Sequence, residues 1–345
     1  MSDKVKRTDV NTLGEFGLID HLTKTNEAKH PSTLLGVGDD AAVLDYGGKP
    51  IVVSTDMLLE GIHFDLMYCP LKHLGYKSVA VNISDICAMN ALPRQITVSI
   101  AISNRFSVEA LDQLYEGIYT ACRNYDVDLV GGDTNSNLKG LVISITALGT
   151  NQKEKLTYRS GAKPGDILCV TGDLGAAYLG LQILEREKQL WQSNPAIQPD
   201  LEDQAYLIGR QLKPEARTDM VKLFDKAGLI PTSMIDISDG LASEVLHICK
   251  ASGTGALVEE AKVPLKDEAQ LMALKFKLDP ITCALSGGED YELLFTADPK
   301  DLPIIRTMPG IFIIGEMTDA NQGVNLQTVN GNIHEITAQG WKHVG

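Results

Sequence analysis

The stretch 36-GVGDDAAVL-44 combines the glycines of a phosphate-binding loop with the wrong charge for one. Two glycines predict a tight turn whose backbone N–H groups can close on a phosphate. Where a phosphate-binding loop supplies Lys, this loop supplies Asp39 and Asp40. Asp40 is the better candidate for a functional carboxylate, whereas Asp39 either ligates a metal or only shapes the turn. Such a loop needs a cation before it can hold phosphate.

The composition predicts a water-soluble globular protein with two domains. The chain has 345 residues, of which 44% are hydrophobic and 22% are charged. Its formal net charge of −14 argues against nucleic-acid binding and against an anionic membrane surface. The charge is compatible with cationic ligands, or with anionic ligands that arrive together with metal ions.

The cysteines and the N-terminus indicate a cytoplasmic protein. The six cysteines are scattered, without a CxxC pair or a histidine at zinc-site spacing. Most lie in apolar runs, where a free thiol packs as a small hydrophobic group. The N-terminal MSDKVKRTDV lacks the apolar core of a signal peptide, and no run approaches 18 uninterrupted apolar residues. We therefore expect neither export nor membrane insertion.

Helix and strand patterns alternate along the chain and predict an α/β protein of mixed α+β type. The polar stretch 150-TNQKEK-155 is the best boundary between an N-terminal domain, residues 1–150, and a C-terminal domain, residues 151–345. Further expectations are a first helix that begins at Thr12, a core helix over 71–91, and a strand over 126–134 that ends in a Gly-Gly-Asp turn. Helices are also expected over about 107–125, 174–188, 201–212, 215–228 and 239–251, and strands over 51–55, 95–103, 141–149, 233–238, 291–297, 311–317 and 324–329.

Acidic residues gather where predicted elements end, beside Gly, Ser or Thr. A single Asp in such a place is usually a turn residue or a helix cap. However, Asp236 lies inside the apolar strand 234-MIDIS-238, Asp56 follows an apolar strand, and Asp85 interrupts an apolar helix. A buried lone carboxylate is costly unless it is paired or bound to a metal. These three positions therefore favour a functional site over capping.

If the carboxylates converge, cations must accompany them. Two unit charges about 4 Å apart repel by about 4 kcal/mol at an effective dielectric constant of 20. Oxygen ligands without a nearby His or Cys set indicate Mg²⁺ or a similar hard ion, which commonly bridges carboxylates to substrate phosphates. The sequence contains no GxxxxGK[ST], no GxGxxG that opens a helix after a first strand, and no EF-hand loop.

Seven motifs, in order, resemble the thiamine-monophosphate kinase family, within the superfamily of aminoimidazole ribonucleotide synthetase and selenophosphate synthetase. The resemblance extends from about Gly14 to 340-GWKH-343. The motifs are 36-GVGDDAAVL-44, 54-STDMLLEGIHF-64, 77-KSVAVNISDICAMNALP-93, 131-GGDT-134, 158-YRSGAKPGD-166, 236-DISDGL-241 and 285-LSGGEDYELLF-295.

The resemblance implies an aminoimidazole ribonucleotide synthetase-like fold that dimerises through the N-terminal sheet, with ATP and several Mg²⁺ ions between the domains. It implies ATP-dependent conversion of thiamine monophosphate to thiamine diphosphate. The implied Mg²⁺ ligands are Asp40, Asp56, Asp85, Asp133, Asp236 and Asp239. The implied ATP-binding residues are Asp40, Ser54, Thr55, Gly132, Arg159 and Ser238. The implied substrate-binding residues are His63, Asp85, Glu289 and Trp341.

The implied reaction needs no strong general base. The attacking group is a phosphate monoester whose second pKa lies near 6, so it is mostly deprotonated at pH 7. The protein has to position two anions and screen their repulsion, largely with Mg²⁺. Trp341 matches an aromatic position that could stack on the thiazolium cation of the substrate.

Other activities remain possible from the sequence. Selenophosphate synthetase requires a reactive cysteine or selenocysteine in an N-terminal segment, and no cysteine precedes the 36–44 loop here. The hydrogenase-maturation relative relies on a C-terminal cysteine, whereas this chain ends 341-WKHVG-345. An aminoimidazole ribonucleotide synthetase-like enzyme and an ATP- and Mg²⁺-binding module without activity stay as alternatives.

Overall fold

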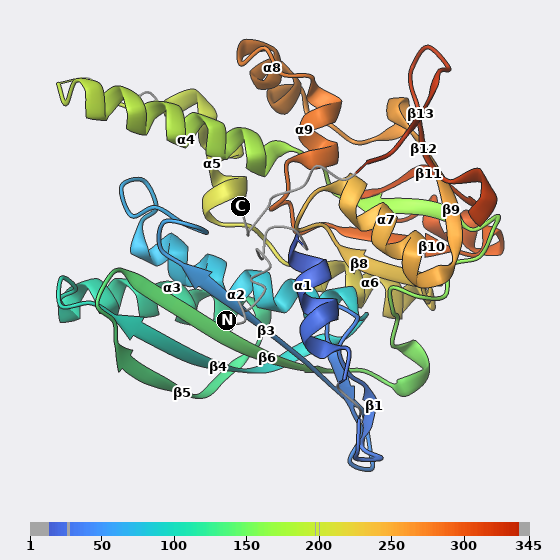
Figure 1. The fold of residues 1–345 in the computed structure, drawn as a ribbon, viewed down its shortest axis with the longest axis horizontal. Coiled ribbons are helices and arrows are strands. Elements are labelled where there is room, and N and C mark those ends of the chain that lie inside the picture. Colours follow the sequence, from blue (N-terminus) through green and yellow to red (C-terminus); the bar gives the residue numbers. More distant parts are fainter. Residues whose placement is uncertain (1–13, 26–27, 197, 200, 338–345) are drawn as a thin grey trace, which may run out of the picture.

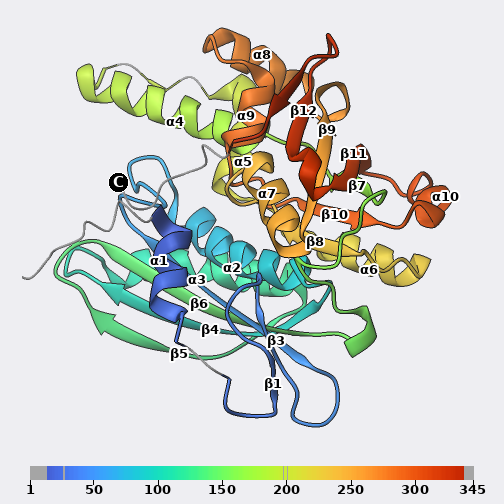
Figure 2. The ribbon, with the colours of Figure 1, turned by 45° about the vertical axis from the view of Figure 1, so that its right-hand side comes forward.

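The protein is built around two β-sheets with helices between and around them (Figures 1 and 2). The computed structural model describes residues 14–25, 28–196, 198–199 and 201–337. The first sheet has six strands in the order β1-β2-β3-β6-β4-β5, and the second has seven in the order β13-β12-β9-β11-β7-β10-β8. Strand pairs are antiparallel except β4–β5 and β12–β9, so the fold is of the mixed α+β type that the sequence predicts.

Over its described residues, the N-terminal half contains the first sheet and three α-helices. Its strands are β1 (Thr33–Leu35), β2 (Ala42–Leu44), β3 (Ile51–Leu59), β4 (Leu92–Ile102), β5 (Asp128–Ser136) and β6 (Leu141–Thr150). Its helices are α1 (Gly14–Thr23), α2 (Leu71–Ala88) and α3 (Val108–Tyr125). Helices α2 and α3 lie on one face of the sheet, between it and the C-terminal half (Figure 1). Along β6 buried residues alternate with half-buried ones, because only one face of the sheet is packed.

The C-terminal half contains the second sheet and seven helices in the described part of the chain. Its strands are β7 (Ile167–Thr171), β8 (Ser233–Asp236), β9 (Thr254–Glu259), β10 (Leu293–Ala297), β11 (Ile311–Asp319), β12 (Val324–Gln327) and β13 (Ile333–Glu335). Its helices are α4 (Ala176–Ser193), α5 (Ala205–Leu212), α6 (Thr218–Ala227), α7 (Leu241–Ser252), α8 (Asp267–Lys275), α9 (Pro280–Ser286) and α10 (Leu302–Ile305).

One hydrophobic core joins the two halves. It runs from the packed face of the first sheet through Ile86 on α2 to Phe224 on α6 and Phe295 on β10. The rings of Phe224 and Phe295 meet edge to face, with centroids 5.1 Å apart. A second core lies between the second sheet and α7, around Val245 and Ile248. These two cores pack the halves firmly. They thereby hold the strand ends and loops that carry the acidic motifs close to each other.

Most of the predicted elements are confirmed, including the core helix α2, of which 14 residues are buried. The six cysteines are free and buried, as their apolar surroundings predict. The expected helix start at Thr12 lies outside the described residues. No helix in the described part of the chain has the length and apolarity needed to span a membrane.

Two expectations about strand ends are wrong. The Gly-Gly-Asp segment is not a turn, because β5 continues through it to Ser136. Gly132 fits there since β4 lies so close that a Cβ atom would sit 1.8 Å from the carbonyl oxygen of Val98. Asp56 does not end its strand but stands within β3, where it is opposite Ile145 of β6. In both cases sheet pairing overrides the local turn preference of Gly and Asp.

Candidate active site

Two adjoining cavities lie between the two halves of the protein. The first, of about 610 Å³, is lined by acidic residues from the 36–44 loop, β3, α2 and the β8–α7 connection. The second, of about 490 Å³, is bounded by the loop after β3 and by helix α4. Four residues line both cavities: His63, Ser238, Asp239 and Glu289. A molecule in one cavity can therefore contact a molecule in the other at this shared wall.

Three carboxylates converge in the first cavity although they are far apart in sequence. Asp40 precedes β2, Asp85 lies in the last turn of α2, and Asp236 ends β8. One oxygen from each carboxylate lies within 4.8 Å of the others. Ser54 Oγ donates to Asp85 Oδ2 at 2.5 Å, and Ser84 Oγ donates to Asp236 Oδ2 at 2.6 Å. These hydroxyl donors orient the carboxylates without neutralising them.

Burial and mutual repulsion make the ionised cluster unfavourable by itself. Burial, together with the charges of Asp56, Asp236 and Asp40, raises the pKa of Asp85 well above its usual value. Burial and the charge of Asp40 raise the pKa of Asp236 to about 7. Burial also raises the pKa of Asp40, although Arg159 opposes the shift. A divalent cation would remove this cost, because it favours the ionised form of each ligand.

The donor set of the cluster fits a hard metal ion. Asp40 Oδ2 is buried and has no hydrogen-bond partner among the described residues, so the described protein groups leave its lone pairs unused. The oxygen ligands of Asp40, Asp85 and Asp236 match the preference of Mg²⁺ for carboxylates. Asp56 and Asp239, two further predicted ligands, line the same cavity, as do the predicted ATP-binding residues Ser54, Thr55, Arg159 and Ser238.

The 36–44 loop is fastened to the C-terminal half by Arg159. Arg159 Nη2 donates to Asp40 Oδ1 at 2.6 Å, while its buried Nε has no partner in the described part of the chain. The Asp39 carboxylate accepts hydrogen bonds from the backbone N–H groups of Asp40, at 3.0 Å, and Arg159, at 3.2 Å. Asp39 therefore shapes the loop, and Asp40 presents its carboxylate to the cavity.

Glu244 is an acidic residue of this cavity that the sequence analysis missed. It lies on α7, it is 2% exposed, and its Oε1 accepts a hydrogen bond from the backbone N–H of Asp239 at 2.8 Å. Burial and the charge of Asp239 raise its pKa well above the usual value. Glu244 interrupts the apolar run 241-LASEVLHI-248, just as Asp85 interrupts an apolar helix. The same reasoning from the sequence would therefore have identified Glu244 as a candidate site residue.

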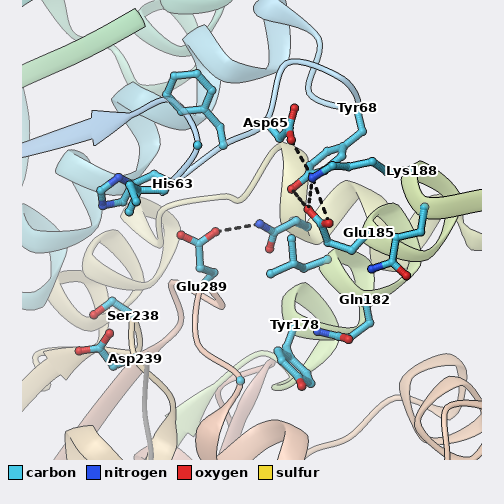
Figure 3. Close-up of a pocket in the computed structure, with 17 residues that line it drawn as sticks. His63, Asp65, Tyr68, Tyr178, Gln182, Glu185, Lys188, Ser238, Asp239 and Glu289 are labelled. Carbon is cyan, nitrogen blue, oxygen red and sulfur yellow. Dashed lines mark hydrogen bonds and ion pairs between the residues drawn. The ribbon is translucent and has the colours of Figure 1, made fainter. Parts of the chain in front are cut away.

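At the end of the second cavity away from the shared wall, Lys188 forms ion pairs with Asp65 at 2.8 Å and with Glu185 at 3.1 Å (Figure 3). Glu289 forms an ion pair with Lys77, whose side chain is 3% exposed. His63 Nδ1 accepts a hydrogen bond from the backbone N–H of Leu59 at 3.0 Å, which fixes its ring at the shared wall. Helix α4 supplies a wall that the sequence analysis did not anticipate, consisting of Tyr178, Leu181, Gln182, Glu185, Lys188 and Gln189.

Two predicted site residues in the described part of the chain do not line these cavities. Gly132 and Asp133 lie on β5 and line a separate, open pocket. In the sheet, β5 is separated from β3, the strand of Asp56, by β6 and β4. Within one chain Asp133 therefore does not reach the carboxylate cluster. Trp341 lies outside the described residues.

Comparisons with known proteins show the broad class of protein to which this chain belongs. A family model described as "AIR synthase related protein, N-terminal domain" matches residues 38–151, and its C-terminal counterpart matches residues 163–326. A solved structure described as "Crystal Structure of Hydrogenase Maturation Protein HypE in complex with ATP" shares the fold, with a TM-score of 0.67 at 19% identity over 98% of this chain and 99% of that chain. The two halves of this protein therefore correspond to the N-terminal and C-terminal domains of the AIR synthase related proteins.

Closer relatives narrow the class to one family. The thiamine-monophosphate kinase of Aquifex aeolicus (strain VF5) is 34% identical over 331 residues, which are 96% of this chain and 98% of that protein. The enzyme of Escherichia coli (strain K12) is 36% identical over 90% of this chain and 92% of its own length. A solved structure described as "AaThiL complexed with AMPPCP and TMP" superimposes with a TM-score of 0.82 at 33% identity, covering 98% of this chain and 99% of that chain. The chain belongs to the thiamine-monophosphate kinase family.

Proposed function

We propose that this protein transfers the γ-phosphoryl group of ATP to the phosphate of thiamine monophosphate and forms thiamine diphosphate. The observation that carries the proposal is the shared wall of the two cavities. The acidic cavity suits a nucleotide polyphosphate with its metal ions, and the second cavity suits an organic phosphate ester whose phosphate reaches the wall. A homologous protein binds AMPPCP, an ATP analogue, together with TMP.

The acidic cavity is expected to hold the ATP phosphates through Mg²⁺. Asp40, Asp85 and Asp236 form the centre of the proposed ligand set, and Asp56 and Asp239 extend it toward the shared wall. When bound, Mg²⁺ supplies positive charge that screens the repulsion between the nucleotide and the second phosphate. Arg159, which lines the same cavity and pairs with Asp40, adds further positive charge there.

The second cavity is expected to hold thiamine monophosphate with its phosphate at the shared wall beside His63 and its thiazolium ring toward Glu289. No residue has to remove a proton, because the acceptor phosphate is already mostly dianionic at neutral pH. The residues instead orient the two phosphates in line and exclude water from the reacting centre. The carboxylate of Glu289 also favours the positively charged thiazolium ring.

We further propose that the enzyme is a homodimer formed through the first sheet, with domains at residues 1–150 and 151–345. The strand β5 is exposed along nearly its whole length, which suits an interface with a second copy. Gly132 and Asp133 on this strand are then candidates to complete the nucleotide site of the partner subunit. Mg²⁺ binding by Asp133 and stacking by Trp341 remain proposals that rest on the family resemblance.

A single assay distinguishes the proposed function from its alternatives. The purified chain is incubated with ATP and Mg²⁺ plus thiamine monophosphate, thiamine or an aminoimidazole ribonucleotide precursor, and ADP and thiamine diphosphate are quantified. We expect ADP and thiamine diphosphate in equal amounts with thiamine monophosphate only, and none after EDTA treatment. ATP binding without transfer to any acceptor would indicate an inactive module, and turnover of the aminoimidazole precursor would indicate the synthetase activity.

A further inference from the structure

Gln211 lines the second cavity and carries a buried hydrogen-bond acceptor without a partner among the described residues. It lies near the end of α5, it is 6% exposed, and it lines this cavity. Its Nε2 donates to Glu289 Oε2 at 3.0 Å, and its main-chain carbonyl accepts from Lys77 Nζ at 3.1 Å. Its Oε1 is buried and has no hydrogen-bond partner in the described part of the chain.

The orientation of the Gln211 amide is fixed by chemistry. A carboxylate accepts hydrogen bonds and cannot donate one, so the group that faces Glu289 must be the NH₂. Rotating the amide would place its oxygen against a negatively charged oxygen. Lys77 supports this arrangement, because its ammonium group forms an ion pair with the Glu289 carboxylate. The Gln211 Oε1 atom therefore faces away from Glu289 and can be satisfied only by a hydrogen-bond donor from another group.

The surroundings of Glu289 also hold the amide in one place. Glu289 and Tyr291 both adopt left-handed backbone conformations, with φ of 61° and 53°. The backbone N–H groups of these two residues donate to the carbonyl groups of Ser238, at 2.7 Å, and Ile237, at 2.8 Å. Non-glycine residues in this region are typical of functional sites held by their surroundings. Because Glu289 is held in this way, its hydrogen bond to Gln211 keeps the Gln211 amide in a fixed position.

The chemistry of the proposed substrate identifies a donor for this acceptor. The reacting phosphate belongs at the wall shared with the nucleotide cavity, so the organic part extends into the rest of the second cavity, where Gln211 lies. Thiamine monophosphate carries its N–H donors only on the 4-amino group of the pyrimidine ring. A buried acceptor without a partner is unfavourable, and a substrate that supplies the partner is preferred over an analogue that does not.

We propose that Gln211 Oε1 accepts a hydrogen bond from the 4-amino group of the substrate and makes the enzyme selective for aminopyrimidine. This inference rests on the proposed function. Gln211 then acts as a specificity-determining residue, while Lys77 acts as a positioning residue that keeps both Gln211 and Glu289 in place. The selectivity resides in this side chain because its amide cannot rotate to suit another ring.

The test compares thiamine monophosphate with its 4-deamino analogue, in which hydrogen replaces the amino group. For the wild-type chain we expect kcat/KM to be roughly 10- to 100-fold higher for the amino substrate. In Gln211→Met, which keeps the side-chain volume but lacks the acceptor, this ratio should fall close to one. Because both substrates are measured on the same preparation, a partly unfolded variant does not alter the ratio.

Gln192→Met is the matched control, since Gln192 is an exposed residue of α4 that lines neither cavity. We expect it to retain the wild-type ratio. A Gln211→Met variant with the wild-type ratio would overturn the inference and leave the proposed function intact. A wild-type chain that forms no thiamine diphosphate would overturn both. Dissociation constants of the two ligands, measured calorimetrically without ATP, should show the same loss of preference.

Discussion

Asp85 illustrates how a single residue at this site lowers the stability of the metal-free protein and at the same time favours cation binding. Its carboxylate lies in the last turn of α2, close to those of Asp40 and Asp236, and in the described part of the chain it accepts a hydrogen bond from the Ser54 hydroxyl alone. In a protein without metal, three close carboxylates repel each other. The same repulsion creates the affinity for cations. Residues of this kind weaken the metal-free fold and strengthen the metal-bound one.

Replacing Asp85 with Asn should therefore change activity and metal-free stability in opposite directions. We expect Asp85→Asn to lower the rate of ADP formation by at least about 100-fold, because a proposed central ligand is lost. In EDTA the same variant should have a higher melting temperature than the wild type, since one repelling charge is gone. Melting curves with EDTA and with Mg²⁺, together with the ADP assay, measure both effects.

Asp203→Asn, at an exposed position remote from both cavities, is the control and should match the wild type in each measurement. An Asp85→Asn variant that is less stable than the wild type in EDTA would show that the carboxylate is a structural hydrogen-bond acceptor. The account of the cluster as an incomplete cation site would then be wrong.

The raised pKa values also predict how the metal-free protein responds to pH. The pKa of Asp236 is about 7 in the folded protein and about 4 in an unfolded chain, so the folded state binds the proton more tightly. The free energy of unfolding in EDTA should therefore fall as pH rises from about 4 to about 7. With Mg²⁺ the ionised form is the bound form, so the increase in melting temperature caused by Mg²⁺ should grow over this range. An increment that is constant from pH 5 to pH 8 would contradict this prediction.

At the scale of elements, the crossing of α2 and α3 positions the site. Gly75 and Gly117 let the two helices approach until their backbones touch: a Cβ atom on Gly75 would lie 2.0 Å from the Leu114 carbonyl oxygen, and one on Gly117 would lie 2.0 Å from that of Lys72. Lys77 and Asp85 are carried by the same helix. A shift of α2 away from α3 would therefore move the proposed substrate and metal residues together.

Gly75→Ala should destabilise the protein by roughly 2 kcal/mol or more, because an added methyl group overpacks a helix contact. Gly209→Ala in α5 is a matched control, since a Cβ atom there meets no atom of the described residues within 4 Å. It should be neutral or stabilising by up to about 1 kcal/mol, as Ala is a better helix former than Gly. Urea unfolding curves measure both changes. Equal effects of the two substitutions would mean that the crossing tolerates an extra methyl group.

At the scale of the whole molecule, polar contacts as well as the common core hold the two halves together. Glu215, in the connection between α5 and α6, accepts hydrogen bonds from Tyr76 at 2.5 Å and Tyr125 at 2.8 Å. Lys77 and Glu289 join the halves inside the site itself. The cavities are thus defined by contacts between segments more than 60 residues apart.

The proposed dimer gives a prediction at this scale. Val130 on β5 is 59% exposed in the single chain. If β5 lies in a subunit interface, Val130→Lys should shift the protein to a monomer and lower its activity in parallel, because Lys on an exposed strand opposes association. Val108→Lys, at a 71% exposed position where α3 begins, should leave both properties unchanged. Sedimentation velocity and the ADP assay measure the two quantities, and an active monomeric Val130→Lys variant would contradict the proposal.

By itself the sequence determined the mixed α+β class, the core helix and the acidic positions around which the site is built. Hydrophobic periodicity marks buried elements, and an Asp that interrupts such a pattern stands out as a costly group, as at Asp85 and Asp236. Glu244 carried the same signal. The ordered motifs carried the resemblance to a family to which the chain proves to belong.

Only the tertiary structure decided which of those residues meet. It joined Asp40, Asp85 and Asp236, separated Asp133 from them within one chain, and brought Gln211 beside Glu289. It also showed that β5 continues through Gly131-Gly132-Asp133, where local composition favours a turn. Local patterns describe how each segment folds. Distances between segments depend on how the sheets and helices pack, and that information is spread over the whole chain.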